Sequence, residues 1–290
     1  MTSPVVLERF GSAENFSAAS VAFLVAREAE NNLLLGITSD LVGGGTFGAE
    51  PPYMAVARRG GAMTAVAMRT PPFGVTLSAT EDLDAIDVIA EDVAREYPSI
   101  PGLIAPVSAA DRFASKWESL KPERRLVRAN ERIHKCSTVN RTRSPRGEMR
   151  VFRESDRELA VQWRKLFISE SKLPNPGGDA ELRAGIDRHL RSRDGGYFFW
   201  DVDGENVSMA AAGGRTPNGI RIGPVYTPPS YRGKGYATSL VADLTQMMLE
   251  RGLSFCFLFT DLANPTSNSI YAQIGYVPVI DCTMYDLKPV

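Results

Sequence analysis

The sequence predicts an α/β (α+β) protein of two units, each a mixed, mainly antiparallel twisted sheet flanked by helices. Three observations lead to this prediction. The 290 residues exceed the ~100–200 of a usual domain, and 43% of them are hydrophobic, enough for a core. The C-terminal half alternates helical and strand-like periodicity. The N-terminal half repeats that order of elements, but not the residues. The segment 142–147 is the best linker, so units at 1–145 and 146–290 are expected.

The C-terminal half gives the clearer pattern. A helix at 156–172 places Leu159, Trp163, Leu166 and Phe167 on one face at three- and four-residue spacing. Asp203-Gly204 is a strong hairpin signal between two strands. The expected elements are strand 147–152, helices 156–172 and 179–191, strands 197–202, 207–214 and 220–227, helix 235–251, buried strand 253–259, helix 264–273 and strand 276–287. The segment 173–178, rich in proline and glycine, is expected to end the helix at 156–172 and separate it from the helix at 179–191.

The N-terminal half predicts a similar series. The helix at 81–97 is amphipathic, with Leu83, Ile86, Ile89 and Val93 facing inward. The expected elements are helix 15–30, strands 53–58, 63–69 and 75–78, helix 81–97, strand 103–107, helix 110–119 and strand 126–138.

Charge and composition narrow the class of protein. The formal net charge of −1 and the pI near 6.2 give no general attraction to nucleic acid. One basic stretch, 121–153, is open to two interpretations: a polyanion-binding patch, or a solvated strand followed by a linker. The second is favoured because aromatic residues are not interleaved with the cations. The basic residues are Lys121, Arg124, Arg125, Arg128, Arg132, Lys135, Arg141, Arg143, Arg146, Arg150 and Arg153.

The reactive side chains indicate neither a metal site nor a disulfide framework. The three cysteines lack metal-type spacing, and Cys256 lies inside an apolar run as a small core residue would. The two histidines, His134 and His189, are far apart in sequence, so a His-rich metal site is not expected. Residues 1–10 lack a signal-peptide pattern, and no apolar run reaches the ~18 residues that span a bilayer. We therefore expect a cytoplasmic protein without membrane contact.

The segment 222–238 is the most informative. It predicts a strand, then a loop with two glycines and two cations, then a helix. Backbone N–H groups at a helix N-terminus are unpaired and the helix dipole is positive there, so this loop suits a pyrophosphate. A nucleotide P-loop is excluded, because Pro228 stands where that motif needs glycine and Gly235 where it needs Ser or Thr. The alternative is a glycine-rich turn with surface cations.

Two motifs resemble those of the GNAT acetyltransferase superfamily. The run 232–237, Arg-Gly-Lys-Gly-Tyr-Ala, is similar to the family's Gln/Arg-x-x-Gly-x-Gly/Ala signature and has the family's position, after a fourth strand and opening a third helix. Downstream, 260–276 resembles the family's next element, a buried strand leading into a short helix with Asn near its start, a Tyr inside it and a Gly-Tyr exit. The resemblance covers about 150–290. Over 1–145 only the order of elements agrees, as in a tandem arrangement with a degenerate first half.

The resemblance implies binding of acetyl-CoA as co-substrate, without a metal. In that family the loop binds the pyrophosphate and the acyl-pantetheine arm lies between two splayed parallel strands. Here Gly223 and Pro224 interrupt the strand, and Pro224 lacks a ladder donor. The binding residues implied are Val225, Tyr226, Thr227, Arg232, Gly233, Lys234, Gly235, Tyr236, Ala237, Thr238, Asn264 and Ser267.

Tyr271 is the candidate general acid that the resemblance implies. A thiol titrates near about 8.5 and a phenol near about 10, so a phenol held close can protonate a departing thiolate. The alternative is a tyrosine packed under the sheet. Candidate bases for the acceptor amine are Asp261, Glu170 or a water relay, because 220–227 holds no carboxylate.

The N-terminal half is expected to bind no CoA. Its equivalent junction, 77–84, has no Arg-Gly-x-Gly run, and Glu81 and Asp82 would repel a pyrophosphate. Gly43 to Gly48 matches a dinucleotide motif, but Pro51-Pro52 prevents the helix that the motif requires. We expect an N-acetyltransferase acting on a small-molecule or peptide amine, as a monomer or homodimer. The alternative is a non-catalytic acyl-CoA-binding regulatory or interaction protein.

Overall fold

The computed structural model describes residues 3–140, 145–171 and 178–290. Contacts within the chain define two compact units: unit 1 comprises Met1–Arg132 with Ile280–Val290, and unit 2 comprises Ile133–Val279. This division differs from the expected one between 145 and 146 in two respects: the boundary lies between Arg132 and Ile133, and the C-terminal segment is part of unit 1. Residues 142–144 of the expected linker at 142–147 lie outside the described residues, and so do residues 173–177 of the expected break at 173–178.

Unit 1 has an antiparallel sheet except for one parallel pair. Strands β1 to β5 lie in order, with only β4 and β5 parallel, and the C-terminal part of β12 pairs antiparallel with β5 from Cys282↔Pro106 to Asp286↔Gly102. The elements are β1 (Val5–Arg9), α1 (Ala13–Val25), α2 (Asn32–Val42), β2 (Tyr53–Arg59), β3 (Ala62–Arg69), β4 (Val75–Leu77), α3 (Leu83–Glu96), β5 (Gly102–Pro106), α4 (Val107–Leu120), most of β6 (Glu123–Cys136) and the end of β12 (Val277–Pro289).

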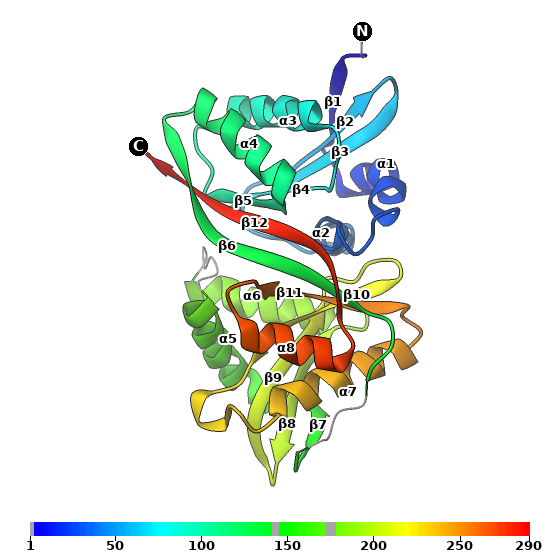
Figure 1. Cartoon of the computed structure of the whole chain (residues 1–290), viewed down its shortest axis with the longest axis vertical. Coiled ribbons are helices and arrows are strands. Elements are labelled where there is room, and N and C mark those ends of the chain that lie inside the picture. Colours follow the sequence, from blue (N-terminus) through cyan, green and yellow to red (C-terminus); the bar gives the residue numbers. More distant parts are fainter. Residues whose placement is uncertain (1–2, 141–144, 172–177) are drawn as a thin grey trace. The chain divides into compact units, whose positions relative to one another are not determined.

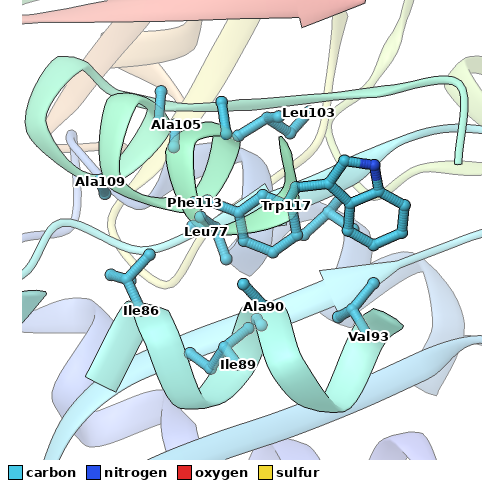
Figure 2. Packing of buried hydrophobic residues seen from close by; sticks show 14 of the residues in the cluster. Leu77, Ile86, Ile89, Ala90, Val93, Leu103, Ala105, Ala109, Phe113 and Trp117 are labelled. Carbon is cyan, nitrogen blue, oxygen red and sulfur yellow. The ribbon is translucent and has the colours of Figure 1, made fainter. Parts of the chain in front are cut away.

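The two faces of the unit 1 sheet are covered by different helix pairs. Helices α3 and α4 pack on the face that carries Tyr53, Ala55 and Ala57, while α1 and α2 pack on the face that carries Met54 and Val56. Figure 2 shows the first of these cores, in which Ile86, Ile89 and Val93 of α3 lie near Phe113 and Trp117 of α4. The three- and four-residue spacing on α3 that predicted this face is therefore confirmed.

One helix of unit 1 was not expected. A single helix was predicted over 15–30, but α1 ends at Val25 and α2 follows at 32–42. Asn31 marks the break: its side chain donates to the carbonyl of Leu24 and accepts from the backbone N–H of Ala79. Gly36 and the β-branched residues after it lower the helix propensity of α2, which hid it in the sequence.

Unit 2 repeats the element order of unit 1. Its strands lie in the order β11-β10-β9-β8-β7, antiparallel except for the pair β10–β11 (Figure 1). The elements are β7 (Glu148–Val151), η1 (Glu154–Asp156), α5 (Arg157–Ser171), α6 (Gly178–Arg191), β8 (Gly196–Val202), β9 (Glu205–Gly213), β10 (Gly219–Tyr226), η2 (Pro229–Tyr231), α7 (Tyr236–Glu250), β11 (Phe255–Asp261) and α8 (Pro265–Ile274).

Unit 2 also has a core on each face of its sheet. Helix α7 packs over Ile220 and Ile222, whereas α5 and α6 pack over Tyr197 and Tyr226. Residues 220, 222 and 226 would share one face of a regular strand, but the register of β10 shifts between Ile222 and Val225. The shift turns Tyr226 to the α5 and α6 face, so this irregular segment of β10 decides which side chains face each side near the strand's end.

The arginines of the basic stretch are largely engaged by carboxylates. The ion pairs formed by the described residues include Arg125–Glu118, Arg128–Asp286, Arg132–Asp281, Arg146–Asp203 and Arg150–Asp156. Arg141 and Arg143 lie outside the described residues. These pairs favour the solvated strand over a polyanion-binding patch. The three cysteines are free and buried, and Cys256 is a core residue as expected.

Candidate active site

Strands β10 and β11 are paired over only part of their length. The parallel register runs from Gly219↔Phe255 to Arg221↔Phe257, although β10 continues to Tyr226 and β11 to Asp261. On its other edge, β10 remains bonded to β9 through Val225↔Ala210 and Tyr226↔Met209. Beyond Arg221, the edge of β10 that faced β11 is therefore available to a ligand with amide groups, which can bond to it as an added strand would.

Helix α7 begins directly after this strand and its loop. Gly235 is the N-cap, with φ of 83°, and no side chain caps the helix. The left-handed conformation at this cap favours glycine, and the first backbone N–H groups of any helix lack helical acceptors. A Cβ at Gly233 would meet nothing within 4 Å, and one at Gly235 only the Pro145 ring at 4.0 Å. The loop thus presents backbone donors, with Tyr236, Ala237 and Thr238 as the first helical residues.

The corresponding helix of unit 1 begins differently. The side chain of Asp82 caps α3 by accepting from the backbone N–H of Ala85. Arg59 makes a two-pronged contact with Asp82, at 2.8 and 2.7 Å. The carboxylate of Asp82, which was expected to repel a pyrophosphate, is therefore neutralised by Arg59 of β2. The N-terminus of α3 is thus closed by its own side chains, whereas that of α7 is not.

The two cations of the loop are held by neighbours. Nε of Arg232 donates to the carbonyl of Thr227 at 2.8 Å, and Nη2 pairs with Oε2 of Glu170 at 2.6 Å. The other oxygen of Glu170 accepts from the hydroxyl of Tyr226 at 3.0 Å. Lys234 lies with its ammonium 5.6 Å from the centre of the Tyr231 ring. Glu170 therefore connects α5 to both the end of β10 and the loop.

Helix α8 carries the remaining predicted residues. Asn264 is its N-cap, and its Oδ1 accepts from the backbone N–H of Ser267 at 3.1 Å. Two turns later, Tyr271 packs against the α7-side core, edge-on to Tyr276 at 5.9 Å. Within the described residues the Tyr271 hydroxyl has no hydrogen-bond partner, whereas that of Tyr276 bonds Thr245 at 2.7 Å. Burial raises the pKa of Tyr271 to about 12, so its proton is retained at neutral pH.

Asp261, the second candidate base, has a local bonding role. Its Oδ1 accepts from the backbone N–H of Ala263 at 2.8 Å, and its carbonyl accepts from Asn264 and Asn268. These bonds shape the turn between β11 and α8.

Among the described residues, no group of three or more His, Cys, Asp or Glu side chains is placed to hold a metal ion. None of the described helices is long and apolar enough to cross a bilayer.

Comparison with known proteins agrees with this geometry. Residues 161–276 match the family model described as the acetyltransferase (GNAT) family. Unit 2 belongs to the GNAT family. The GNAT match spans α5 to Tyr276, including the parted strands, the uncapped helix and α8. An acetyltransferase of Pectobacterium atrosepticum is 26% identical over 138 residues, which cover 47% of this chain and 90% of the relative.

Solved GNAT structures are similar to the whole chain. A GNAT-family acetyltransferase from Colwellia psychrerythraea has a TM-score of 0.62 at 10% identity, covering 98% of this chain and all of the other. A tandem GNAT protein from the clavulanic acid biosynthesis pathway has a TM-score of 0.59 at 13% identity, covering 99% of each chain. At such identities the likeness concerns the fold. The fold of the whole chain is thus similar to that of a tandem GNAT protein, as expected.

Three site features were not found from the sequence. Ser208 on β9 bonds the Thr227 hydroxyl at 2.8 Å, which anchors the end of β10. The bridging of Tyr226 and Arg232 by Glu170 was not foreseen either. The third is a group of cations around His189 on the α5 and α6 face. Each joins residues far apart in sequence and no local motif marks them.

Proposed function

We propose that unit 2 transfers the acetyl group of acetyl-CoA to a primary amine by direct attack in a ternary complex. The observation that carries the proposal is the parting of β10 and β11 after Arg221–Phe257, followed by a helix whose N-terminus no side chain caps. Parted strand edges suit the pantetheine amides, and the helix start suits the pyrophosphate. The GNAT match over 161–276 supports the same reading, since acetyl transfer is the family's general reaction.

The binding roles follow from position. Backbone groups of Val225, Tyr226 and Thr227 lie on the edge of β10 beyond the last β11 pair. The Thr227 carbonyl is already occupied by Arg232, so its N–H is the group left for the arm. The pyrophosphate takes the backbone donors of 233–238. Asn264 and Ser267 at the start of α8 contact the arm from the other side. The Oδ1 of Asn264 is used by the Ser267 N–H, so within the described residues its side-chain N–H₂ is the group that can donate to the arm.

The chemistry needs one nucleophile, one developing oxyanion and one proton. The neutral amine attacks the acetyl carbonyl carbon, forming the C–N bond, and negative charge builds on the oxygen, where a strand N–H near Val225 stabilises it. Collapse breaks the C–S bond, the sulfur takes the Tyr271 proton, and the resulting phenolate regains a proton through solvent, which balances the proton that the amine loses. Glu170 is bonded to Tyr226 and Arg232, and Asp261 to its own turn, so we assign the amine's proton to a water relay.

Tyr271 is suited to the acid role by its environment. Its hydroxyl has no partner within the described residues, and its raised pKa keeps the phenol protonated at the pH where a thiolate leaves. A purely structural tyrosine at this place would be expected to donate a hydrogen bond to a neighbour, as the Tyr276 hydroxyl and Thr245 bond each other.

The proposed acceptor is a small-molecule or peptide amine in a cytoplasmic setting. Unit 1 is, in this proposal, a degenerate GNAT-like unit that binds no CoA.

The rival function is an acyl-CoA-binding protein without turnover. Release of free thiol from acetyl-CoA, measured with a panel of primary amines, separates the two. The proposal predicts amine-dependent thiol release by the wild-type chain and its loss in Tyr271→Phe. Tight CoA binding without thiol release for any amine would instead support the rival.

A further inference from the structure

A cluster of basic side chains lies on the α5 and α6 face of unit 2. It comprises Arg164 on α5, Arg188 and His189 on α6, and Arg221 on β10. The His189 ring is 5.4 Å from the Tyr197 ring, and its Nδ1 is 2.8 Å from the carbonyl oxygen of Gly185. A Cβ on Gly213 would lie only 2.6 Å from His189 Cδ2, so the imidazole is pressed against β9.

The electrostatics of the cluster are strongly positive. Burial, together with the charges of Arg164, Arg221 and Arg188, lowers the pKa of His189 to about 4, although the hydrogen bond to the Gly185 carbonyl acts in the opposite direction. Burial raises the pKa of Tyr197, and the Arg164 charge partly offsets this. Glu181 neutralises Arg188 through a 2.6 Å pair, and Asp194 is engaged by Arg215. Among the described residues, no carboxylate pairs with Arg164.

Two polar groups of the cluster are buried side by side, and neither donates a hydrogen bond to an acceptor in the described part of the chain. They are the hydroxyl of Tyr197, on a side chain that is 0% exposed, and Nε of Arg164. Both can donate a hydrogen bond. Buried donors without acceptors are uncommon in native proteins and call for an explanation. One anionic oxygen pair would accept from both and would also offset the charge around His189.

This cluster lies on the side of the sheet that reaches the proposed reaction centre. Arg221 belongs to the last β10–β11 pair, after which the strands part. Tyr197 and Tyr226 belong to the same core cluster, and Tyr226 ends β10. A molecule bound at Arg164 and Tyr197 is therefore on the α5 and α6 face, beside the strand segment assigned to the acetyl group.

We propose that Arg164 and Tyr197 form a subsite for an anionic group of the acceptor, so that the substrate is an amine that also carries a carboxylate or phosphate. This inference rests on the proposed acetyl transfer. Arg164 supplies a charged donor and Tyr197 a neutral one, and together they orient the acceptor so that its amine, at the other end, meets the acetyl carbon.

The kinetic test uses amines in matched pairs: carboxylates with their carboxamides, and phosphate esters with their alcohols. The wild-type chain is expected to prefer one anionic series, which identifies the anion. Arg164→Gln and Tyr197→Phe should raise KM for that series about tenfold or more and leave the neutral partners unchanged. Arg193→Gln, at an exposed arginine next to α6, is the matched control and should change neither. Equal treatment of charged and neutral partners by the wild type would overturn the proposal.

A binding test works even if no amine is turned over. The chain has two histidines, so the imidazole NMR signals of His189 can be assigned by His189→Gln, with His134 as the internal reference. Titration with inorganic phosphate and with acetate should raise the pKa of His189 in the wild type, and less so in Arg164→Gln. No effect of either anion on the wild type would overturn the subsite. A rise in the pKa of His189 on anion binding, without thiol release for any amine, would support the anion site and contradict acetyl transfer.

Discussion

Oε2 of Glu170 lies 2.6 Å from Nη2 of Arg232, and this ion pair joins α5 to the loop before α7. Both side chains are nearly half exposed, at 44% and 48%, so the pair contributes little stability, ~0–1 kcal/mol. Its structural effect is larger, because Arg232 also bonds the Thr227 carbonyl and Glu170 also bonds Tyr226. The pair fixes the loop that leads to the helix N-terminus.

Glu170→Gln tests whether this carboxylate is the catalytic base. Both of its oxygens are occupied, so we expect kcat to stay within a few-fold of wild type. Removing its charge beside Arg232 should leave CoA affinity unchanged or modestly tighter. Steady-state kinetics and calorimetry measure the two effects. A hundredfold loss of kcat at neutral pH, with the rate restored at alkaline pH where the amine is already neutral, would instead show that Glu170 takes the amine's proton.

Gly235→Val is expected to weaken CoA binding strongly, because it strains a backbone with φ of 83° and places a side chain among the helix donors. Gly252→Val is the matched control. Gly252 lies at the other end of α7, has φ of 92° and has nothing within 4 Å of its Cβ position. Both variants should lose similar thermal stability, but only Gly235→Val should lose CoA affinity in calorimetry. Equal CoA affinities in the two variants would show that the pyrophosphate binds elsewhere.

Tyr271→Phe is expected to lower kcat about 10²–10⁴-fold while CoA affinity stays near wild type. The ring packing is kept and only a hydroxyl without a partner among the described residues is lost. Because the pKa of Tyr271 is raised to about 12, kcat should not fall through loss of this proton until the pH exceeds about 10. Turnover by the variant at the wild-type rate would make Tyr271 a packing residue.

Tyr276→Phe is the companion variant for that experiment. It removes the buried hydrogen bond to Thr245 and should cost about 0.5–1.5 kcal/mol of unfolding free energy, with kcat preserved. The two neighbouring tyrosines thus separate an effect on rate from an effect on stability.

His189 should make stability depend on pH in the acid range. Its pKa is lowered from 6.5 to about 4 in the folded state, so the unfolded chain binds more protons between these values. The free energy of unfolding should therefore fall as the pH drops from about 6.5 to about 4. In His189→Gln the slope of the unfolding free energy against pH should decrease by the equivalent of up to about one bound proton. Denaturant titrations at several pH values measure it, and an unchanged slope in His189→Gln would contradict the assignment.

Much of the fold could be predicted from the sequence because its signals are local. The apolar face of α3, the glycines between Arg232 and Tyr236 and the Asn at the start of α8 can be recognised from neighbouring residues, and α7 and α8 begin within one residue of the expected positions. The attachment of Ile280–Val290 to unit 1 was not predicted, because β12 pairs with β5 some 180 residues earlier in the chain, counted from Cys282↔Pro106. The same holds for the contact of Arg59 with Asp82.

Within the proposed site, some features have a signal in the sequence and others have none. Its loop and Tyr271 follow from motifs, whereas the engagement of Arg232 by Glu170 depends on how α5 lies against β10. The Arg164, Tyr197 and His189 group brings together α5, β8 and α6, and its residues have no common spacing. Such groups become visible only when burial and hydrogen-bond partners are known.

The central claim is that one CoA site exists per chain, at the N-terminus of α7, while α3 is closed by Asp82 and Arg59. Calorimetric titration of the full chain with CoA tests this most directly. We predict a stoichiometry of one, abolished by Gly235→Val and retained in Gly252→Val. A second equivalent of CoA, or binding that survives Gly235→Val with the fold intact, would contradict the account.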